Sequence, residues 1–149
     1  MKFRLVDSII RYCENTSINT RKAISFEEFS LLKRWGRKGE FPELLILQLA
    51  VESAAFLMAV SSQFKYIGLL KTIDYVKYKA QTAPGDILEC KINTMPDSNG
   101  SNSSYKYLIK TGKQIISEGA FTLEPVQLEM FYDPKIYMMM LEEICVQTF

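Results

Sequence analysis

The 149-residue sequence contains no histidine. This absence excludes Ser-His-Asp and Cys-His nucleophilic sites, and it removes the side chain that most often serves as a general base near neutral pH. Any acid–base chemistry of this protein must therefore fall to carboxylates, tyrosines, lysines or cysteines.

The sequence also lacks an excess of charge of either sign, since it contains 18 Lys and Arg residues and 17 Asp and Glu residues. This balance gives no electrostatic reason to bind nucleic acid. The cysteines Cys13, Cys90 and Cys145 lie far apart without a Cys-x-x-Cys pair, so we expect no zinc site, no disulfide framework and no cofactor. The first sixteen residues carry charges too early for a signal peptide, and we expect a cytoplasmic protein.

Glycine and proline are missing from the interior of one long hydrophobic stretch, residues 42–63. About twenty residues are too many for a strand, so the stretch predicts a helix, with Pro42 in its first turn and Glu43 complementing the helix dipole. A helix that is apolar on every side lies inside a fold. The polar residues Gln48 and Glu52 near its middle argue against a membrane span.

Gln48 and Glu52 are spaced i,i+4 and therefore lie on one face of this helix. Two interpretations are open. Glu52 reaches a solvated rim while Gln48 satisfies a backbone group, or the pair faces an apolar cavity, where desolvation would raise the pKa of Glu52.

The rest of the chain predicts antiparallel strands around this helix. Without βαβ alternation, the order predicts an α+β fold in which a curved antiparallel sheet rolls around the helix. We expect one domain at residues 1–126 and a C-terminal extension, 127–149. The expected elements are a hairpin (5–12 and 18–24), a short helix (25–35), a long bent strand (64–83), a strand (87–94), a polar loop (97–104), a second hairpin (105–110 and 114–123) and a final helix (134–146).

Three segments carry a resemblance to a known family. They are FRLVD at residues 3–7, GEFP at 39–42 followed by LILQ at 45–48, and VKYK at 76–79 followed by PGD at 84–86. Together they resemble the β-hydroxyacyl-(acyl carrier protein) dehydratases of the hot-dog fold, over roughly residues 3–125. The last segment is the most specific of the three.

The resemblance implies a 3-hydroxyacyl thioester dehydratase, a lyase of fatty-acid or related lipid or polyketide biosynthesis, with a substrate tunnel beside the central helix. Members of the family use a histidine and, on the partner's helix, a carboxylate. Here Glu40 replaces the histidine, Gln48 stands at the carboxylate position and Glu52 at a glutamine position. Glu43 replaces a glycine whose N–H polarises the thioester carbonyl. Another register places Glu52 at the carboxylate position.

From this resemblance we assign three groups of site residues. In catalysis, Glu40 would be the base if burial raised its pKa, and Glu52 the protonated partner. The catalytic candidates are Glu40, Gln48 and Glu52. The substrate-binding candidates are Phe41, Pro42, Glu43 and Tyr78. The candidates for binding an acidic carrier protein are Arg34, Arg37, Lys38, Lys77 and Lys79.

Two other functions stay open because the histidine is lost. One is a non-catalytic acyl-binding or partner subunit, and the other is a hot-dog thioesterase in which a carboxylate activates water. The implied partners are an acyl carrier protein or an acyl-CoA thioester, together with a second copy of the chain in a homodimer or a trimer of dimers.

Overall fold

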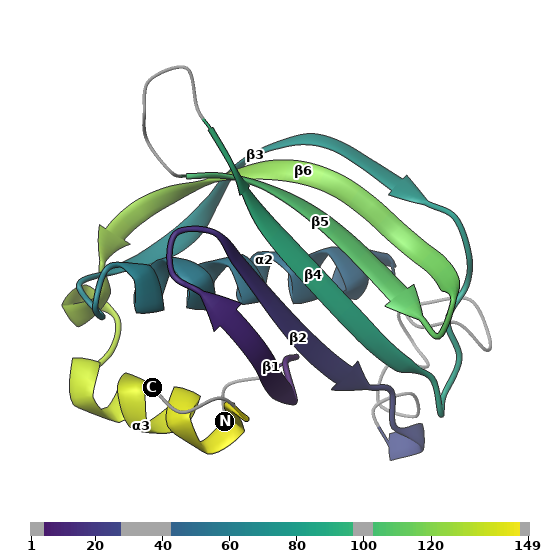
Figure 1. Ribbon diagram of the computed structural model, residues 1–149, viewed down its shortest axis with the longest axis horizontal. Helices are drawn as coiled ribbons and strands as arrows, with labels where there is room; N and C mark the ends of the chain where they lie inside the picture. The colour runs from purple at the N-terminus through teal and green to yellow at the C-terminus, as the bar shows by residue number, and fades with distance from the viewer. Residues whose placement is uncertain (1–4, 28–42, 97–102, 147–149) are drawn as a thin grey trace.

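An antiparallel sheet of six strands wraps around one long helix, as Figure 1 shows. The computed structural model describes residues 5–27, 43–96 and 103–146 of the chain. The strands are β1 (Ser8–Cys13), β2 (Ser17–Ala23), β3 (Tyr66–Tyr78), β4 (Ile87–Met95), β5 (Ser104–Thr111) and β6 (Gln114–Gln127). The helical elements are α2 (Glu43–Ser61), the short 3-10 helix η1 (Leu128–Met130) and α3 (Pro134–Ile144). The strand order is β1-β2-β4-β5-β6-β3, which confirms the predicted α+β architecture and both hairpins.

The central helix α2 confirms the helix predicted for residues 42–63. By length and by a mean hydropathy of 2.0 it could cross a membrane, but 67% of its most apolar window is buried inside the fold. The sheet covers it, as in a core helix of a globular protein. Ser53 at its middle is buried, donates a hydrogen bond to the Leu49 carbonyl oxygen and shares another with the Thr20 hydroxyl of β2, each at 2.7 Å.

Strand β3 is long and bent, as the sequence predicts. Its pairing with β6 shifts register between Leu70 and Thr72 and again between Ile73 and Tyr75. Such bulges bend a strand and increase its twist. Opposite the second bulge, β6 carries Gly119, where a Cβ atom would lie 2.5 Å from the Tyr75 carbonyl oxygen. The curvature of this part of the sheet therefore requires a glycine at that position.

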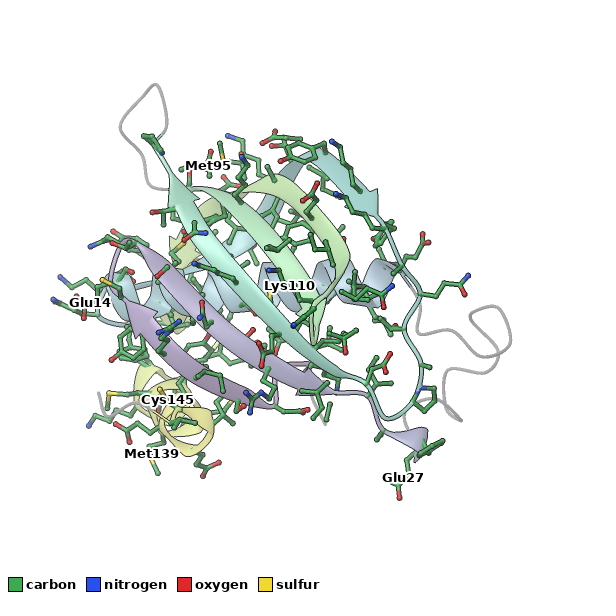
Figure 2. All side chains as sticks on the ribbon, turned by 45° about the vertical axis from the view of Figure 1, so that its right-hand side comes forward. Glu14, Glu27, Met95, Lys110, Met139 and Cys145 are labelled. Atoms are coloured by element: carbon green, nitrogen blue, oxygen red, sulfur yellow. The ribbon has the colours of Figure 1, made fainter. Side chains whose placement is uncertain are left out.

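The two edges of the sheet differ. Beside β1, the end of the chain adds a parallel bridge between Ile9 and Cys145, and the Val146 N–H donates to the Ile9 carbonyl oxygen at 2.9 Å. Figure 2 shows Cys145 next to this edge. Strand β3 forms the other edge, and within the described ranges nothing pairs with its outer side. An open edge strand of 13 residues is a surface on which another chain can pair.

The last strand is longer than predicted. It was expected to end at residue 123, before a tail that follows Pro125, but β6 continues to Gln127. Pro125 is tolerated there because β5 pairs with β6 only up to Thr122, and the Leu123 N–H makes the next bond on that side, to the Ser103 carbonyl oxygen at 2.8 Å. No N–H donor is needed on that side at residue 125.

The C-terminal helix α3 is confirmed. Asp133 caps it by accepting a hydrogen bond from the Lys135 N–H at 2.9 Å, and Pro134 occupies its first turn. Its buried residues, Tyr137, Leu141 and Ile144, belong to the same hydrophobic cluster as the core of the sheet. The extension is thus packed onto the domain that precedes it.

Two predicted segments lie largely outside the described residues. Of the short helix expected at residues 25–35, only residues 25–27 are described, and Phe26 and Glu27 are helical. Of the polar loop expected at residues 97–104, residues 97–102 are not described, and Ser104 already begins β5.

We expect Gly119→Ala to lower the free energy of unfolding by roughly 1–3 kcal/mol, because the new methyl group meets backbone that cannot move without disturbing the β3 bulge. Gly68→Ala is the comparison and should cost less, since the three atoms nearest to its new Cβ all belong to the Leu123 side chain, at 2.5–3.2 Å, and none to the backbone. Urea denaturation monitored by circular dichroism measures both. Unchanged stability of Gly119→Ala would contradict the requirement for glycine.

Candidate functional site

A cavity of about 350 Å³ lies beside α2. A volume of this order suits a small ligand. Its lining comes from three parts of the chain that are distant in sequence: α2, the first residues of β3, and the segment around α3. Most of the lining side chains are apolar or aromatic. The principal lining residues, polar and apolar together, are Gln48, Glu52, Ala55, Ile67, Leu69, Tyr132, Tyr137 and Met140.

The predicted polar pair of α2 lines this cavity. Gln48 and Glu52 stand one turn apart, and the small Ala55 follows on the same side, which leaves space against the helix. Gln48 is exposed and Glu52 is half-buried. The helix thus presents an amide and a carboxyl group side by side in a mainly apolar recess.

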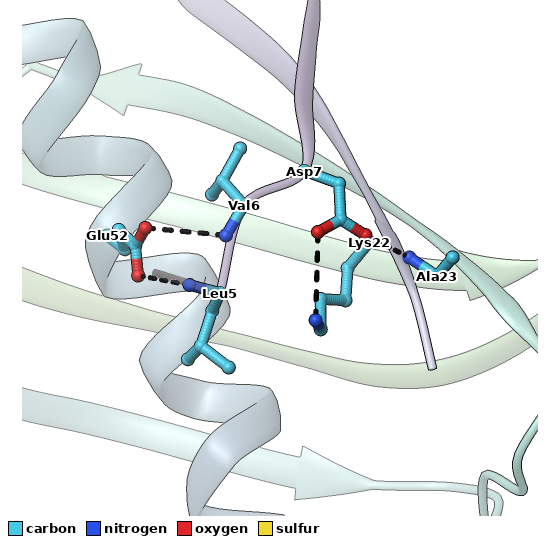
Figure 3. A network of polar contacts seen from close by, with 6 residues as sticks. All are labelled: Leu5, Val6, Asp7, Lys22, Ala23 and Glu52. Carbon is cyan, nitrogen blue, oxygen red and sulfur yellow. Dashed lines mark hydrogen bonds and ion pairs between the residues drawn. The ribbon is translucent and has the colours of Figure 1, made fainter. Parts of the chain in front are cut away.

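Glu52 also forms hydrogen bonds with the backbone of Leu5 and Val6. Its Oε2 atom accepts a hydrogen bond from the Leu5 N–H at 3.1 Å, and its Oε1 atom accepts one from the Val6 N–H at 3.3 Å (Figure 3). Hydrogen bonds from backbone N–H groups favour the ionised form of a carboxyl group. The neutral Glu52 expected from the sequence stays a prediction, and these two bonds act against it.

A second contact, missed by sequence reasoning, fixes the same segment on its other side. Lys22 of β2 is 1% exposed, and its Nζ atom lies 3.7 Å from Oδ1 of Asp7. Oδ2 of Asp7 accepts a hydrogen bond from the Ala23 N–H at 2.7 Å (Figure 3). A buried lysine requires such a partner. The available signal was a lysine at an inward-facing position of an alternating strand.

Other predicted site residues lie elsewhere. The Tyr78 hydroxyl donates to the Glu43 carbonyl oxygen at 2.7 Å and so ties the end of β3 to the first turn of α2. Burial, and then the charge of Glu43, raise the pKa of Tyr78. Neither residue lines the cavity. Nζ of Lys79 pairs with Glu118 at 3.1 Å, and Nζ of Lys77 lies 5.7 Å from the Tyr75 ring centre.

Six of the predicted site residues lie outside the part of the chain that the structure describes. They are Arg34, Arg37, Lys38, Glu40, Phe41 and Pro42. Their predicted roles in catalysis, substrate binding and carrier binding stay predictions.

The most specific segment of the resemblance forms a turn. Gly85 has a φ of +96°, and its N–H donates to the Ile24 carbonyl oxygen at 2.8 Å. Oδ2 of Asp86 accepts from the Ala83 N–H at 2.9 Å, and the Asp86 carbonyl oxygen accepts from the Ile24 N–H at 2.9 Å. Residues 84–86 therefore join β2 to the start of β4. None of them lines the cavity, so this motif reports on the fold.

Sequence reasoning placed no site residue in the C-terminal segment, yet Tyr137 of α3 lines the cavity. Its ring centre lies 5.2 Å from that of Tyr132 and 6.3 Å from that of Phe56. Burial raises the pKa of the Tyr137 hydroxyl, and the charges of Tyr132 and Glu52 raise it further. The available signal was the i,i+4,i+7 spacing of Tyr137, Leu141 and Ile144, which marks one face of a helix as buried.

Comparison with known proteins found similarity in structure only. No protein-family model matches the chain, and no curated protein does. The fluoroacetyl-CoA thioesterase FlK superposes with a TM-score of 0.64 at 15% identity, over 86% of this chain and 97% of that one. The protein smu.793 from Streptococcus mutans, solved with acetyl-CoA bound, gives 0.62 at 12% identity over 80% and 88%. The dehydratase heterocomplex ApeI:P from Xenorhabdus doucetiae gives 0.58 at 16% identity over 76% and 91%.

Identities this low show the fold alone. The chain has the hot-dog fold, which confirms that part of the resemblance. Thioesterases stand among the similar structures beside the dehydratase, so the comparison selects neither activity.

We expect Glu52→Gln to lower the free energy of unfolding by about 1–2 kcal/mol, because an amide has one acceptor oxygen and leaves one of the two N–H groups without its partner. Glu43→Gln, an exposed glutamate on the same helix, is the control and should change stability by less. Urea denaturation of the three proteins measures this. Equal stability would show that the segment at Leu5 and Val6 does not depend on the Glu52 carboxylate.

Proposed function

We propose that this protein binds acyl thioesters, with the acyl group in the cavity beside α2, and hydrolyses them. The observation that carries the proposal is the mainly apolar cavity with Gln48 and Glu52 on its wall. A hot-dog protein with a bound acetyl-CoA and a fluoroacetyl-CoA thioesterase among the similar structures support it.

The hydrogen bonds of Glu52 favour hydrolysis over dehydration. Dehydration needs an acid that protonates the leaving 3-hydroxyl group, whereas hydrolysis needs a base that takes a proton from water. Two backbone N–H donors favour the ionised form of Glu52, which is the form that a base requires. The water oxygen then attacks the thioester carbonyl carbon, the C–S bond breaks, and the thiolate leaves and takes up the proton. Gln48, one turn away, can orient the water or the carbonyl group.

Dehydration of a 3-hydroxyacyl thioester is the second candidate. The motif at residues 76–79 and 84–86 and the similarity to the ApeI:P dehydratase heterocomplex favour it. It depends on Glu40 as the base. A partner subunit without activity would keep the cavity and bind the same ligands.

Hydrolysis and dehydration are both compatible with a substrate that is attached to an acyl carrier protein. The predicted surface for this carrier includes Lys77 near the end of β3 and Lys79 just after that strand. Lys79 is already paired with Glu118, and surface contacts of this kind are weak and screened by salt. Acyl-CoA and acyl carrier thioesters are both proposed substrates.

We further propose that two copies of the chain pair through β3. Its edge is open, and it exposes large apolar side chains: Leu69 44%, Leu70 43%, Ile73 46% and Tyr75 40%. Leu69 and Leu70 also line the cavity, so a second copy on this edge would stand next to the bound acyl group.

Product analysis tests the reaction. We expect the purified full chain to convert an acyl-CoA or a 3-hydroxyacyl-CoA into free acid and thiol, measured by a thiol reagent and mass spectrometry. Glu52→Gln should lower kcat by roughly 10²–10⁴-fold, the range for loss of a general base. Glu142→Gln, at an exposed position of α3 that does not line the cavity, is the control and should stay close to wild type. An enoyl product would identify a dehydratase, and binding without any product would identify an acyl-binding subunit.

Light scattering tests the pairing. We expect a dimer at micromolar concentration, and a monomer when Ile73→Lys places a charge on the β3 edge. Ile87→Lys is the matched control, because Ile87 is 51% exposed but lies on β4. A wild-type monomer would disprove the pairing.

A further inference from the structure

Strand β2 carries a lysine on the side that faces the interior of the fold. The side chains of Ile18, Thr20 and Lys22 alternate toward this side, and each is at most 1% exposed. Burying a lysine costs free energy, and ion pairs in such places can often be replaced by apolar side chains without loss of stability. The pair that Lys22 forms with Asp7 therefore needs an explanation other than stability.

Asp7 is fixed to β2 by three contacts. Its N–H donates to the Arg21 carbonyl oxygen at 2.9 Å, its Oδ2 atom accepts from the Ala23 N–H at 2.7 Å, and its Oδ1 atom lies 3.7 Å from Nζ of Lys22. The Asp7 side chain is 47% exposed, whereas that of Lys22 is buried. Turning Asp7 out into solvent would separate the two charges, so the lysine keeps this carboxylate on β2.

The two residues before Asp7 reach Glu52. The side chains of Leu5 and Val6 are 1% and 0% exposed, and their N–H groups donate to the two carboxylate oxygens of Glu52 at 3.1 and 3.3 Å. Figure 3 shows these residues between Glu52 on one side and the Lys22–Asp7 pair on the other. Both bonds are at the long end of the normal range for N–H donors, so a small shift of the segment would break them.

We propose that Lys22 and Asp7 are positioning residues for Glu52: the pair holds the backbone of residues 5 and 6 against α2, so that two N–H groups stay on the carboxylate. These N–H groups favour the ionised form of the carboxyl group. The use of Glu52 as a base rests on the proposed function, whereas the hold on its carboxylate does not. The site would then depend on a lysine of β2 that does not line the cavity.

Other charges near Glu52 do not obscure this effect. Among the described residues that line the cavity, the titratable groups besides Glu52 are Tyr132 and Tyr137, and tyrosine hydroxyls are neutral in the acid range where carboxyl groups titrate. Strand β3 contributes only apolar residues and a glycine to the wall. Lys22 and Asp7 carry opposite charges, so removing both changes the electrostatic potential at Glu52 little.

An NMR titration of the Glu52 carboxyl carbon tests this on the full chain, with Glu52→Gln identifying the signal. The double variant Lys22→Met, Asp7→Asn removes the pair as a unit, without a change in net charge. We expect the measured pKa of Glu52 to rise by about one unit, because the N–H donors move away from the carboxylate. The amide hydrogens of Leu5 and Val6 should exchange with solvent about tenfold faster.

The double variant Arg21→Gln, Glu89→Gln is the matched control. It removes an exposed ion pair of 3.1 Å between β2 and β4, and it should leave the pKa of Glu52 unchanged. If the first double variant does not fold, Lys22→Met alone takes its place, because the half-exposed Asp7 then keeps its contact with water. Amide exchange at residues 5 and 6 is its readout, since the lost lysine charge would itself raise the pKa of Glu52.

The titration and the hydrolysis assay separate this inference from the proposed function. A pKa of Glu52 that stays or falls in the double variant, or that rises equally in the control, would overturn the inference and leave the proposed function intact. A base acts when deprotonated, so a raised pKa should move the acid limb of kcat to higher pH. The expected rise without hydrolysis by the wild type would uphold the inference and overturn the proposed function.

Discussion

Burial of α2 is the constraint on which the rest of the structure depends. A helix that is apolar around its whole circumference is stable only where other elements cover every side, and the bulges of β3 together with Gly119 bend the sheet enough to cover most of it. Near Glu52 the cover comes instead from Leu5 and Val6, as Figure 3 shows, and one turn later Tyr137 of α3 packs on Phe56. The cavity lies where these added parts meet the sheet, so the same constraint that makes the fold also sets the place of the site.

The fold could be predicted because its signals are local. The apolar run at residues 42–63, the alternating strands and the turn residues each report on their own segment, and together they select one wrapping. The partners of Glu52 could not be predicted, because they are backbone N–H groups 46 and 47 residues away, and any residue type carries such a group. Tyr137 was missed for a related reason: its spacing marks a buried helix face but says nothing about which cavity that face closes.

The most specific motif of the resemblance to dehydratases has a structural role in this chain. Residues 84–86 hold a turn through Gly85 and Asp86, and this turn explains the motif by the fold alone. The residues that would decide between reactions are different ones: Glu52 with its two backbone N–H donors, and Gln48 one turn away. In the proposed function they would serve as the base and the orienting amide beside one mainly apolar recess.

The central claim is that the acyl group of a thioester lies between α2, β3 and α3. A crystal structure of the full chain with S-butyl-CoA, a thioether that cannot be hydrolysed as a thioester, tests it most directly. The account predicts electron density for the butyl chain in the cavity beside Glu52, Ala55 and Ile67. Density for the chain at any other place, with the recess beside Glu52 unchanged, would contradict it.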